Sequence, residues 1–338
     1  MVKISSLEFG KNSFRKLCNL KFEFADRLTL IAGHNGIGKS TILGLIAAAS
    51  GITGPKNTRY KSYFSKFYYV DINDIIHLDP SELENNTITP PWPRLVYSYL
   101  QNKEKKEHWK NIRITRRSGT ERLRSVATTD SKSPDGGNLS AGKDKKVQLP
   151  TIYLGMIRML PIGETSADDV DTIVDNTIDP EDAIYLRDFV ASVIPQCSKE
   201  KTTEITTQTI KNTQKNSKHP AYLECTSKSV SLGQDSLSSI ATAVASFHRL
   251  QRELGKNYQG GVLIIDEIDS GFHPHAQQKL IDALKNAARK LSLQIIATTH
   301  SPFLIEYVHP ESPIQDNSRR VMDKVIYLAG DPPSIPDS

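Results

Sequence analysis

The chain of 338 residues contains only three cysteines, Cys18, Cys197 and Cys225. Their spacing matches no metal or redox motif, and the odd number argues against a disulfide framework. No run of about 18 apolar residues is present, so the sequence predicts no transmembrane helix. Segment 1–10 alternates polar and apolar residues and lacks the apolar region of a signal peptide. We therefore expect a cytoplasmic protein without a membrane partner.

The chain also has no large excess of one charge, because 43 Lys and Arg residues face 38 Asp and Glu residues, for a net charge of +5. This balance alone does not indicate a nucleic-acid partner. The charges are unevenly distributed, however. Segment 103–146 holds 13 basic and six acidic residues, whereas segment 164–188 holds nine acidic residues and one arginine. The sequence is therefore electrically bipolar.

The most informative motif is glycine-rich. Residues 33–41, GHNGIGKST, fit the phosphate-binding pattern G-x-x-x-x-G-K-[ST], between a predicted strand at 27–32 and a predicted helix at 41–50. In this setting backbone amides and the helix dipole bind phosphate. We expect Lys39 to reach the β- and γ-phosphates and the Ser40 hydroxyl to bind Mg²⁺. The alternative is a simple glycine turn. The predicted nucleotide-binding residues of the loop are Asn35, Gly36, Ile37, Gly38, Lys39, Ser40 and Thr41.

A second motif joins an apolar strand to two carboxylates. Residues 260–269, GGVLIIDEID, contain the continuous apolar run that is typical of a strand buried on both faces of a sheet. We expect Asp266 to hold Mg²⁺ through water and Glu267 to polarise the water that attacks the γ-phosphate. Alternatively, the two acids simply end an ordinary strand. The glycine-rich loop elsewhere in the chain favours the functional interpretation.

A third motif, LQIIATTHSPFL at residues 293–304, is another apolar strand, and it ends in Thr298, Thr299 and His300. A helix predicted over 274–291 connects it to the preceding strand. Such a strand–helix–strand unit places both carboxyl ends at the same edge of the sheet, where ligands of open α/β sheets bind. A lone histidine after a strand is usually an ordinary residue. The shared edge nevertheless predicts that His300 senses the γ-phosphate.

Elsewhere the sequence predicts strands, helices and polar loops. We expect half-buried strands over 2–9 and 20–26, further antiparallel strands between 94 and 129, and helices over 180–194 and 235–254. The polar stretch 198–219 is either a β-hairpin or a mobile insertion. Segment 131–146 is predicted to be a flexible loop. No internal repeat and no sustained heptad pattern is present.

Together the three motifs resemble the nucleotide-binding heads of ABC-type ATPases of the SMC/RecF/OLD branch, and the chain is similar to the OLD-like and Septu-type ATPase subunits of bacterial anti-phage systems. The resemblance implies an α/β, P-loop NTPase fold of the ABC-ATPase type: a mixed central sheet flanked by helices, an antiparallel β subdomain and a helical signature lobe. It implies a single head over 1–338. Lobe I would comprise 1–55 and 256–338, with a β-rich basic insertion at about 95–160 and the signature lobe at about 165–255.

In this family ATP lies between two heads, and a serine–glycine signature from the opposite subunit completes each site. The best match is VSLGQD, in which Ser231 would contact the partner's γ-phosphate and Gly233 would permit close backbone approach. The motif departs from the usual LSGGQ, and a plain helix N-cap is the alternative. Arg15 resembles a nucleotide-contacting arginine or is an ordinary surface residue. The family's glutamine loop has three weak candidates, Asp71, Asn73 and Gln101.

The resemblance therefore implies a head that forms a homodimer, or a higher oligomer, around ATP and Mg²⁺. It would hydrolyse ATP to ADP and phosphate, with Glu267 and His300 as catalytic residues. Its role would be that of a switch or sensor in a nucleic-acid-directed, anti-phage defence complex. OLD proteins carry a nuclease domain that has no counterpart before Ser338, so we expect the effector nuclease to be a partner protein or to lie in a segment outside this sequence. A non-hydrolysing ATP-dependent scaffold and the nucleotide-binding subunit of an ABC transporter are the alternatives.

The basic segment 103–146 is a candidate surface for DNA or RNA. Beside Trp109 it contains a cluster of arginines that could follow a phosphate backbone. These are Arg113, Arg116, Arg117, Arg122 and Arg124. Alternatively, the cluster is a solvated face or is complementary to segment 164–188 of a neighbouring subunit.

Overall fold

A parallel sheet of five strands forms the centre of the computed structural model, which describes residues 1–11, 14–52, 60–102, 104–129, 143–195, 197, 204–223, 226, 229–309 and 322–329. The strand order is β13-β3-β12-β11-β7, and each neighbouring pair is parallel. The strands are β3 (Leu28–Gly33), β7 (Thr151–Leu154), β11 (Gly261–Ile265), β12 (Leu293–Thr299) and β13 (Asp323–Leu328).

Both faces of this sheet are buried at its inner strands β11 and β12. Along β11, Leu263 and Ile265 point into one hydrophobic core, while Val262 and Ile264 point into another. Because neither face reaches water, the strand is apolar at every position instead of alternating. Its place between β12 and β7 confirms the predicted position in the middle of the sheet.

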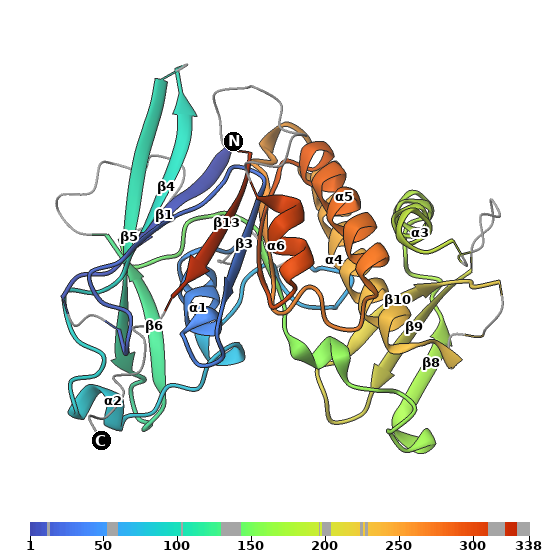
Figure 1. Cartoon of the computed structure of the whole chain (residues 1–338), viewed down its shortest axis with the longest axis horizontal. Helices are drawn as coiled ribbons and strands as arrows, with labels where there is room; N and C mark the ends of the chain where they lie inside the picture. Colours follow the sequence, from blue (N-terminus) through green and yellow to red (C-terminus); the bar gives the residue numbers. More distant parts are fainter. Residues whose placement is uncertain are drawn as a thin grey trace, which may run out of the picture.

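A separate antiparallel sheet covers one side of the parallel sheet, with α1 (Lys39–Ala49) packed between the two (Figure 1). Its order is β2-β1-β4-β5-β6. The strands are β1 (Val2–Glu8), β2 (Lys21–Glu23), β4 (Arg94–Gln101), β5 (Glu104–Arg116) and β6 (Leu123–Thr128). The predicted α/β, P-loop fold class with an antiparallel β subdomain is confirmed, but the prediction of a mixed central sheet is wrong, because every neighbouring pair in the central sheet is parallel. The antiparallel strands form separate sheets, and α1 packs between the parallel sheet and the larger of them.

Helices cover the other side of the parallel sheet, beginning with α4 (Leu232–Leu254) and α5 (Pro274–Lys290). Further out lie α3 and a three-stranded antiparallel sheet of order β10-β9-β8 (Figure 1). The remaining helices are α2 (Ser81–Glu84), α3 (Pro180–Val193) and α6 (Pro302–Val308), and the outer strands are β8 (Val170–Val174), β9 (Ile205–Ile210) and β10 (Asn216–Pro220). Strands β9 and β10 form the predicted hairpin, although residues 198–203 lie outside the described part.

The lobe boundaries remain predictions, but the strand pairings bear on them. Strand β7 lies within the predicted insertion at about 95–160, yet it pairs with β11 of the parallel sheet. Most of the predicted loop 131–146, and Cys225, lie outside the described residues. Within the part of the chain that the structure describes, no helix is both long and apolar enough to cross a membrane.

Candidate active site

The glycine-rich loop connects the carboxyl end of β3 to the first residue of α1. Gly36 and Gly38 have φ angles of 74° and 107°, which L side chains rarely adopt. No side chain caps the N-terminus of α1, so its first amide groups are free to bind an anion. The predicted strand–loop–helix unit is therefore present. Asn35 and Gly36 are exposed on the loop, whereas Ile37 packs against the core below it.

Lys39 folds back over this loop and is only 8% exposed. Its Nζ donates hydrogen bonds to the carbonyl oxygens of Gly33 at 2.8 Å and His34 at 3.0 Å. Burial lowers the pKa of Lys39, whereas the nearby carboxylates, Glu267 first, act against this shift. The ammonium group is thus held inside the loop, where phosphate oxygens can replace the two carbonyl acceptors.

Asp266 follows β11 and meets the glycine-rich loop through Ser40. The Ser40 hydroxyl donates to Oδ2 of Asp266 at 3.3 Å, and the Thr298 hydroxyl donates to Oδ1 at 2.5 Å. A hydroxyl and a carboxylate are oxygen donors of the kind that Mg²⁺ prefers, together with substrate phosphates and water. Among the described residues, no group of three or more His, Cys, Asp or Glu could hold a metal. The pair Ser40 and Asp266 therefore fits a magnesium site that phosphate oxygens complete.

Glu267 lies in a turn that several hydrogen bonds hold. Its φ angle is 48°, an uncommon value for a residue other than glycine. The backbone N–H donates to the Thr298 hydroxyl at 2.7 Å, and the Ser270 hydroxyl donates to Oε2 of Glu267 at 3.1 Å. The carboxylate is therefore placed at the same sheet edge as Asp266, and its role in polarising water remains a prediction.

His300 is exposed after the end of β12. Its backbone N–H donates to Oδ1 of Asp269 at 3.2 Å, and the Thr299 hydroxyl donates to the same oxygen at 2.6 Å. These bonds connect the turn after β11 to the end of β12. The structure thus brings His300 to the predicted edge of the sheet, and its part as a phosphate sensor remains a proposal.

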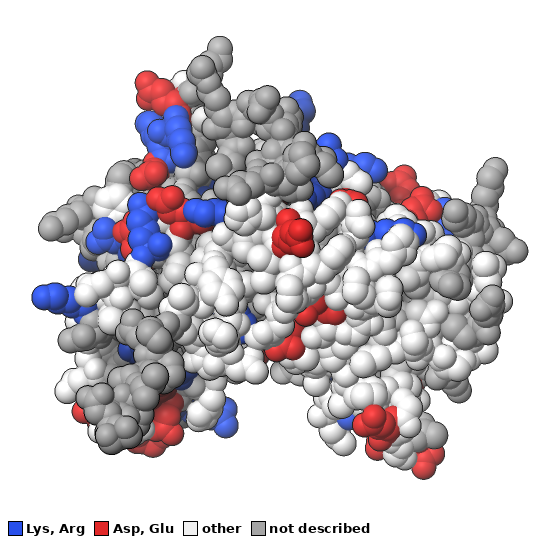
Figure 2. All heavy atoms as spheres, viewed as in Figure 1, with Lys and Arg blue, Asp and Glu red and all other residues white. Residues whose placement is uncertain are grey.

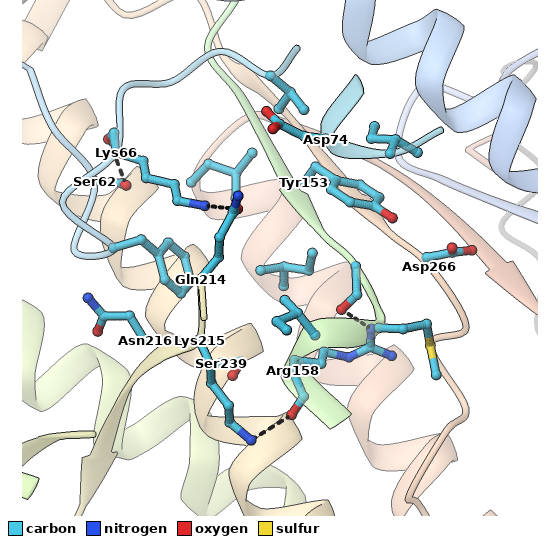
Figure 3. A pocket seen from close by; sticks show the side chains of 18 of the residues that line it. Ser62, Lys66, Asp74, Tyr153, Arg158, Gln214, Lys215, Asn216, Ser239 and Asp266 are labelled. Carbon is cyan, nitrogen blue, oxygen red and sulfur yellow. Dashed lines mark hydrogen bonds between the residues drawn. The ribbon is translucent and has the colours of Figure 1, made fainter. Parts of the chain in front are cut away.

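The pairing of β7 with β11 adds two side chains that the sequence did not reveal. Tyr153 lies on β7 and Arg158 follows it, and both line a cavity of about 710 Å³ that also borders Asp266 (Figure 3). Burial raises the pKa of Tyr153, and the carboxylate of Asp266 adds to the shift. The sequence signal was the short, mainly apolar stretch TIYL, which is too brief to be placed in a sheet.

Arg15 lies next to the helix that leaves the glycine-rich loop, although another partner binds it. Its guanidinium forms a bidentate ion pair with the carboxylate of Glu82, with Nε–Oε1 and Nη2–Oε2 distances of 2.6 and 3.0 Å. Nη1 also approaches the Thr41 hydroxyl, at 3.4 Å. Arg15 thus borders the site. To contact a nucleotide, its guanidinium would have to give up part of its ion pair with Glu82.

The predicted signature segment begins α4. Ser231 caps the helix, because its hydroxyl accepts the N–H of Gln234 at 3.3 Å while the Gln234 side chain accepts the N–H of Ser231 at 2.8 Å. The plain N-cap alternative therefore describes Ser231 within one chain. A Cβ at Gly233 would lie 2.6 Å from the carbonyl oxygen of Gly271. The close backbone approach expected of Gly233 is thus made to the turn after Glu267.

The three candidates for a glutamine loop have different positions. Asp71 caps a short 3₁₀ helix (Ile72–Asp74) that contains Asn73, and the Asp71 side chain accepts the N–H of Asn73 at 3.0 Å. Asn73 also lines the cavity beside Asp266. Gln101 ends β4, in the antiparallel sheet. The segment after β7, residues 155–159, instead contacts the turn that follows β11, because Arg158 donates to the carbonyl oxygen of Glu267 at 2.6 Å.

Charged side chains gather over the antiparallel sheet, whereas the middle of the same face is largely uncharged (Figure 2). All five arginines of the predicted cluster are exposed. Arg113 and Arg124 line an open groove with Lys145, on the outer face of β5 and β6. Lys110, in contrast, is fully buried and donates to the Thr129 hydroxyl at 2.5 Å. The basic segment is thus divided between a surface and an internal support.

Several acids of segment 164–188 are paired within the chain. Asp175 forms a buried ion pair with Lys218. Arg252 binds Asp182 at 2.8 Å and Asp179 at 3.2 Å. These ion pairs neutralise part of the negative charge of segment 164–188 within the chain. They connect α3 to α4 and the end of β8 to β10.

Comparison with known proteins gives one family and several similar chains. The family model described as "AAA domain, putative AbiEii toxin, Type IV TA system" matches residues 28–306. An uncharacterized ABC transporter ATP-binding protein of Methanocaldococcus jannaschii is 34% identical over 76 residues, which cover 22% of this chain and 14% of that protein.

Three solved structures of SMC heads align with most of this chain. The SMC head domain from Thermotoga maritima has 15% identity and a TM-score of 0.45, and the alignment covers 90% of this chain and 91% of that one. An SMC head bound to the C-winged helix domain of ScpA has 13% identity and a TM-score of 0.48, with coverage of 90% and 91%. A head from Pyrococcus furiosus, bound to the C-terminal domain of ScpA, has 11% identity and a TM-score of 0.44, with coverage of 90% and 92%.

Proposed function

Because the chain belongs to the family of AAA domains described as putative AbiEii toxins of type IV toxin–antitoxin systems, we propose that it binds Mg-ATP and hydrolyses it to ADP and phosphate. The chain is a P-loop ATPase head of the ABC type. One observation carries the proposal: Ser40, at the start of α1, lies 3.3 Å from the carboxylate of Asp266. Residues from distant segments thereby form one site for a triphosphate and a divalent cation.

Hydrolysis in this site depends mainly on position and charge. The loop amides and Lys39 would hold the phosphates, and Ser40 with Asp266 would hold Mg²⁺, which neutralises the charge that develops on the phosphate oxygens. Glu267 would orient the attacking water and accept its proton. His300 would bind the γ-phosphate from the end of β12.

Replacement of Lys39 tests this proposal. We expect Lys39→Ala to weaken ATP binding roughly ten- to hundredfold, since one charge-assisted bond to phosphate is lost. Lys11→Ala, at an exposed position, is the matched control. Isothermal titration calorimetry with ATP and Mg²⁺ measures both. Equal binding by the parent and Lys39→Ala, or no binding by the parent, would contradict the proposal.

Glu267→Gln distinguishes hydrolysis from a purely structural use of ATP. We expect this variant to bind ATP with unchanged affinity and to release almost no phosphate. If the parent also releases none, with or without DNA, the non-hydrolysing scaffold becomes the better description.

We further propose that ATP joins two heads through the face that carries the site. Met156, Ile157 and Leu232 are apolar and 42%, 45% and 38% exposed, which is unusual beside a polar site. Met156 and Ile157 follow β7, and Leu232 is the first residue of α4. Burial of this patch would bring Ser231 of one copy toward the ATP of the other. In the presence of ATP, the particle mass of Glu267→Gln should be that of a dimer. The particle mass of Glu267→Gln/Leu232→Lys should remain that of a monomer.

The finer role that we propose is an ATP-dependent switch in a nucleic-acid-directed defence complex with an effector partner. The family description and the exposed arginines of β5 and β6 support it. We expect Arg113→Glu/Arg124→Glu to weaken duplex DNA binding and to lower the salt dependence by about one unit of slope per lost phosphate contact. Lys256→Glu, on an exposed turn, is the control. Salt-independent or absent DNA binding by the parent would leave no role for this groove.

A further inference from the structure

Arg158 is a buried arginine that joins three parts of the molecule. Its side chain belongs to the segment after β7, and the residue is only 2% exposed. Nη1 donates to the carbonyl oxygen of Gly155 at 3.0 Å, and Nη2 donates to that of Glu267 at 2.6 Å. Nε donates to the hydroxyl of Ser236, on α4, at 3.1 Å. One guanidinium therefore connects the end of β7, the turn that carries Glu267 (the catalytic turn of the proposed function) and the predicted signature helix α4.

If the only role of Arg158 were to stabilise the fold, a buried guanidinium would be an unfavourable choice. The three acceptors are neutral oxygens, and burial lowers the pKa of Arg158, with the carboxylate of Asp266 acting against the shift. Apolar residues of similar volume often fill a buried position as well as a charged group does, or better. The guanidinium is nevertheless aimed at one atom of the catalytic turn, the carbonyl oxygen of Glu267 (Figure 3 shows its position beside Asp266).

The backbone of Glu267 is fixed on both sides. Thr298 accepts its N–H, and Arg158 binds its carbonyl oxygen. With a φ angle of 48°, this residue keeps an uncommon conformation that depends on its surroundings. A shift of Arg158 would therefore rotate the peptide group and move the carboxylate.

Arg158 is also tied to the outer hairpin. Lys215, just before β10, donates to the carbonyl oxygen of Arg158 at 3.2 Å (Figure 3) and forms an ion pair with Asp235. Asp235 lies in the first turn of α4, is 1% exposed and accepts the Ser217 hydroxyl at 3.1 Å. The N-terminal part of α4 is thus connected through buried polar contacts to the segment that carries Arg158.

We propose that Arg158 is a positioning residue that transmits displacement of the N-terminus of α4 to the carboxylate of Glu267. This inference rests on the proposed function. Gly233 lies against Gly271, and α4 begins beside the exposed Leu232, so a second head docked on this face would press on α4. Movement of Ser236 would then move the guanidinium and, with it, the catalytic turn. Hydrolysis would thereby depend on dimer formation.

The test compares Arg158→Met with Arg158→Lys. For Arg158→Met we expect kcat at saturating ATP to fall roughly ten- to hundredfold, as the loss of a charge-assisted bond allows. The Kd for ATP should stay within about twofold, because Arg158 binds none of the loop residues. Arg158→Lys should recover part of kcat, since an ammonium can still reach one carbonyl. Arg187→Met, which removes a largely buried arginine of α3, should keep the parent kcat.

Hydrogen exchange provides the readout that a merely structural role would not move. In the parent we expect ATP to protect both the glycine-rich loop and segment 267–271. In Arg158→Met the loop should remain protected and 267–271 should not. Equal protection of both segments, or a kcat within twofold of the parent, would overturn the proposal, as would parallel losses of kcat and ATP affinity.

Two controls keep the result decisive. If Arg158→Met does not fold, Ser236→Ala replaces it, since this change removes only the link to α4. We then expect kcat to fall about threefold to tenfold with unchanged Kd, and an unchanged kcat would overturn the proposal. If the parent binds ATP without hydrolysing it, the proposed function fails, whereas the exchange experiment still decides whether Arg158 couples α4 to the turn.

Discussion

Replacement of Thr298 by valine removes one hydroxyl that holds both acids of the candidate site. Thr298 is fully buried, and its hydroxyl donates to Asp266 at 2.5 Å while it accepts the N–H of Glu267 at 2.7 Å. A valine fits the same space in β12 and cannot form either bond. The change therefore tests whether this hydroxyl positions the two acids.

The magnitude follows from the two bonds. A hydrogen bond to a charged group contributes about 1.5–3 kcal/mol, and a buried N–H left without an acceptor costs about 1–3 kcal/mol. The added methyl group of valine offsets part of the loss. We expect the free energy of unfolding to fall by about 2–4 kcal/mol, which lowers Tm by about 3–6 °C in a chain of this size.

The magnesium requirement separates this effect from ordinary destabilisation. Without Thr298, the carboxylate of Asp266 can rotate, so half-maximal ATPase activity should need about tenfold more Mg²⁺. Thr29→Val is the matched control, because the Thr29 hydroxyl is also fully buried and accepts the N–H of Ala25 at 2.9 Å, away from the candidate site. We expect it to cost about 1–2 kcal/mol and to leave the Mg²⁺ requirement unchanged. A Thr298→Val protein with a Tm within about 1 °C of the parent and an unchanged Mg²⁺ requirement would refute this reasoning.

Two further predictions concern stability. Burial lowers the pKa of Lys3 from 10.5 to about 8, so the unfolded chain binds this proton more tightly than the folded chain does. The free energy of unfolding of the parent should therefore rise between pH 8 and 10.5. Urea denaturation should show a smaller rise for Lys3→Met than for Lys11→Met, the control at an exposed position. Equal slopes would contradict this. Gly233→Ala should lower stability by about 1–2 kcal/mol, because its Cβ would lie 2.6 Å from the carbonyl oxygen of Gly271, whereas Gly163→Ala, which meets no atom within 4 Å, should be neutral in thermal unfolding. Equal Tm values for the two alanine variants would rule out the close contact.

Local patterns made much of the site predictable. The glycine-rich loop, the acids after β11 and the polar end of β12 each follow an apolar strand, and parallel strands with a helix between them place their carboxyl ends together. The pair Ser40–Asp266 confirms that placement. Ser231 shows the limit of such reasoning, since the same residues suit both a helix cap and a signature, and within one chain the cap is what forms.

Arg15 and Lys110 illustrate what a one-dimensional reading misses. Arg15 was expected to face solvent or nucleotide, and it binds Glu82 instead. Lys110 belongs to a basic run, and it is a fully buried residue of β5. In both cases the partner comes from a segment whose position depends on the packing of the whole chain, so no local pattern records it.

The sequence by itself determined that a phosphate-binding loop, a pair of acids and a polar strand end exist, because each depends on residues close together in the chain. Only the tertiary structure decided that β7 pairs with β11, and thereby that Tyr153 and Arg158 lie beside Asp266 and Glu267. The four residues of β7 carry too little information to specify a partner strand. The partner is selected when both faces of the sheet are buried together, which is a property of the folded chain as a whole.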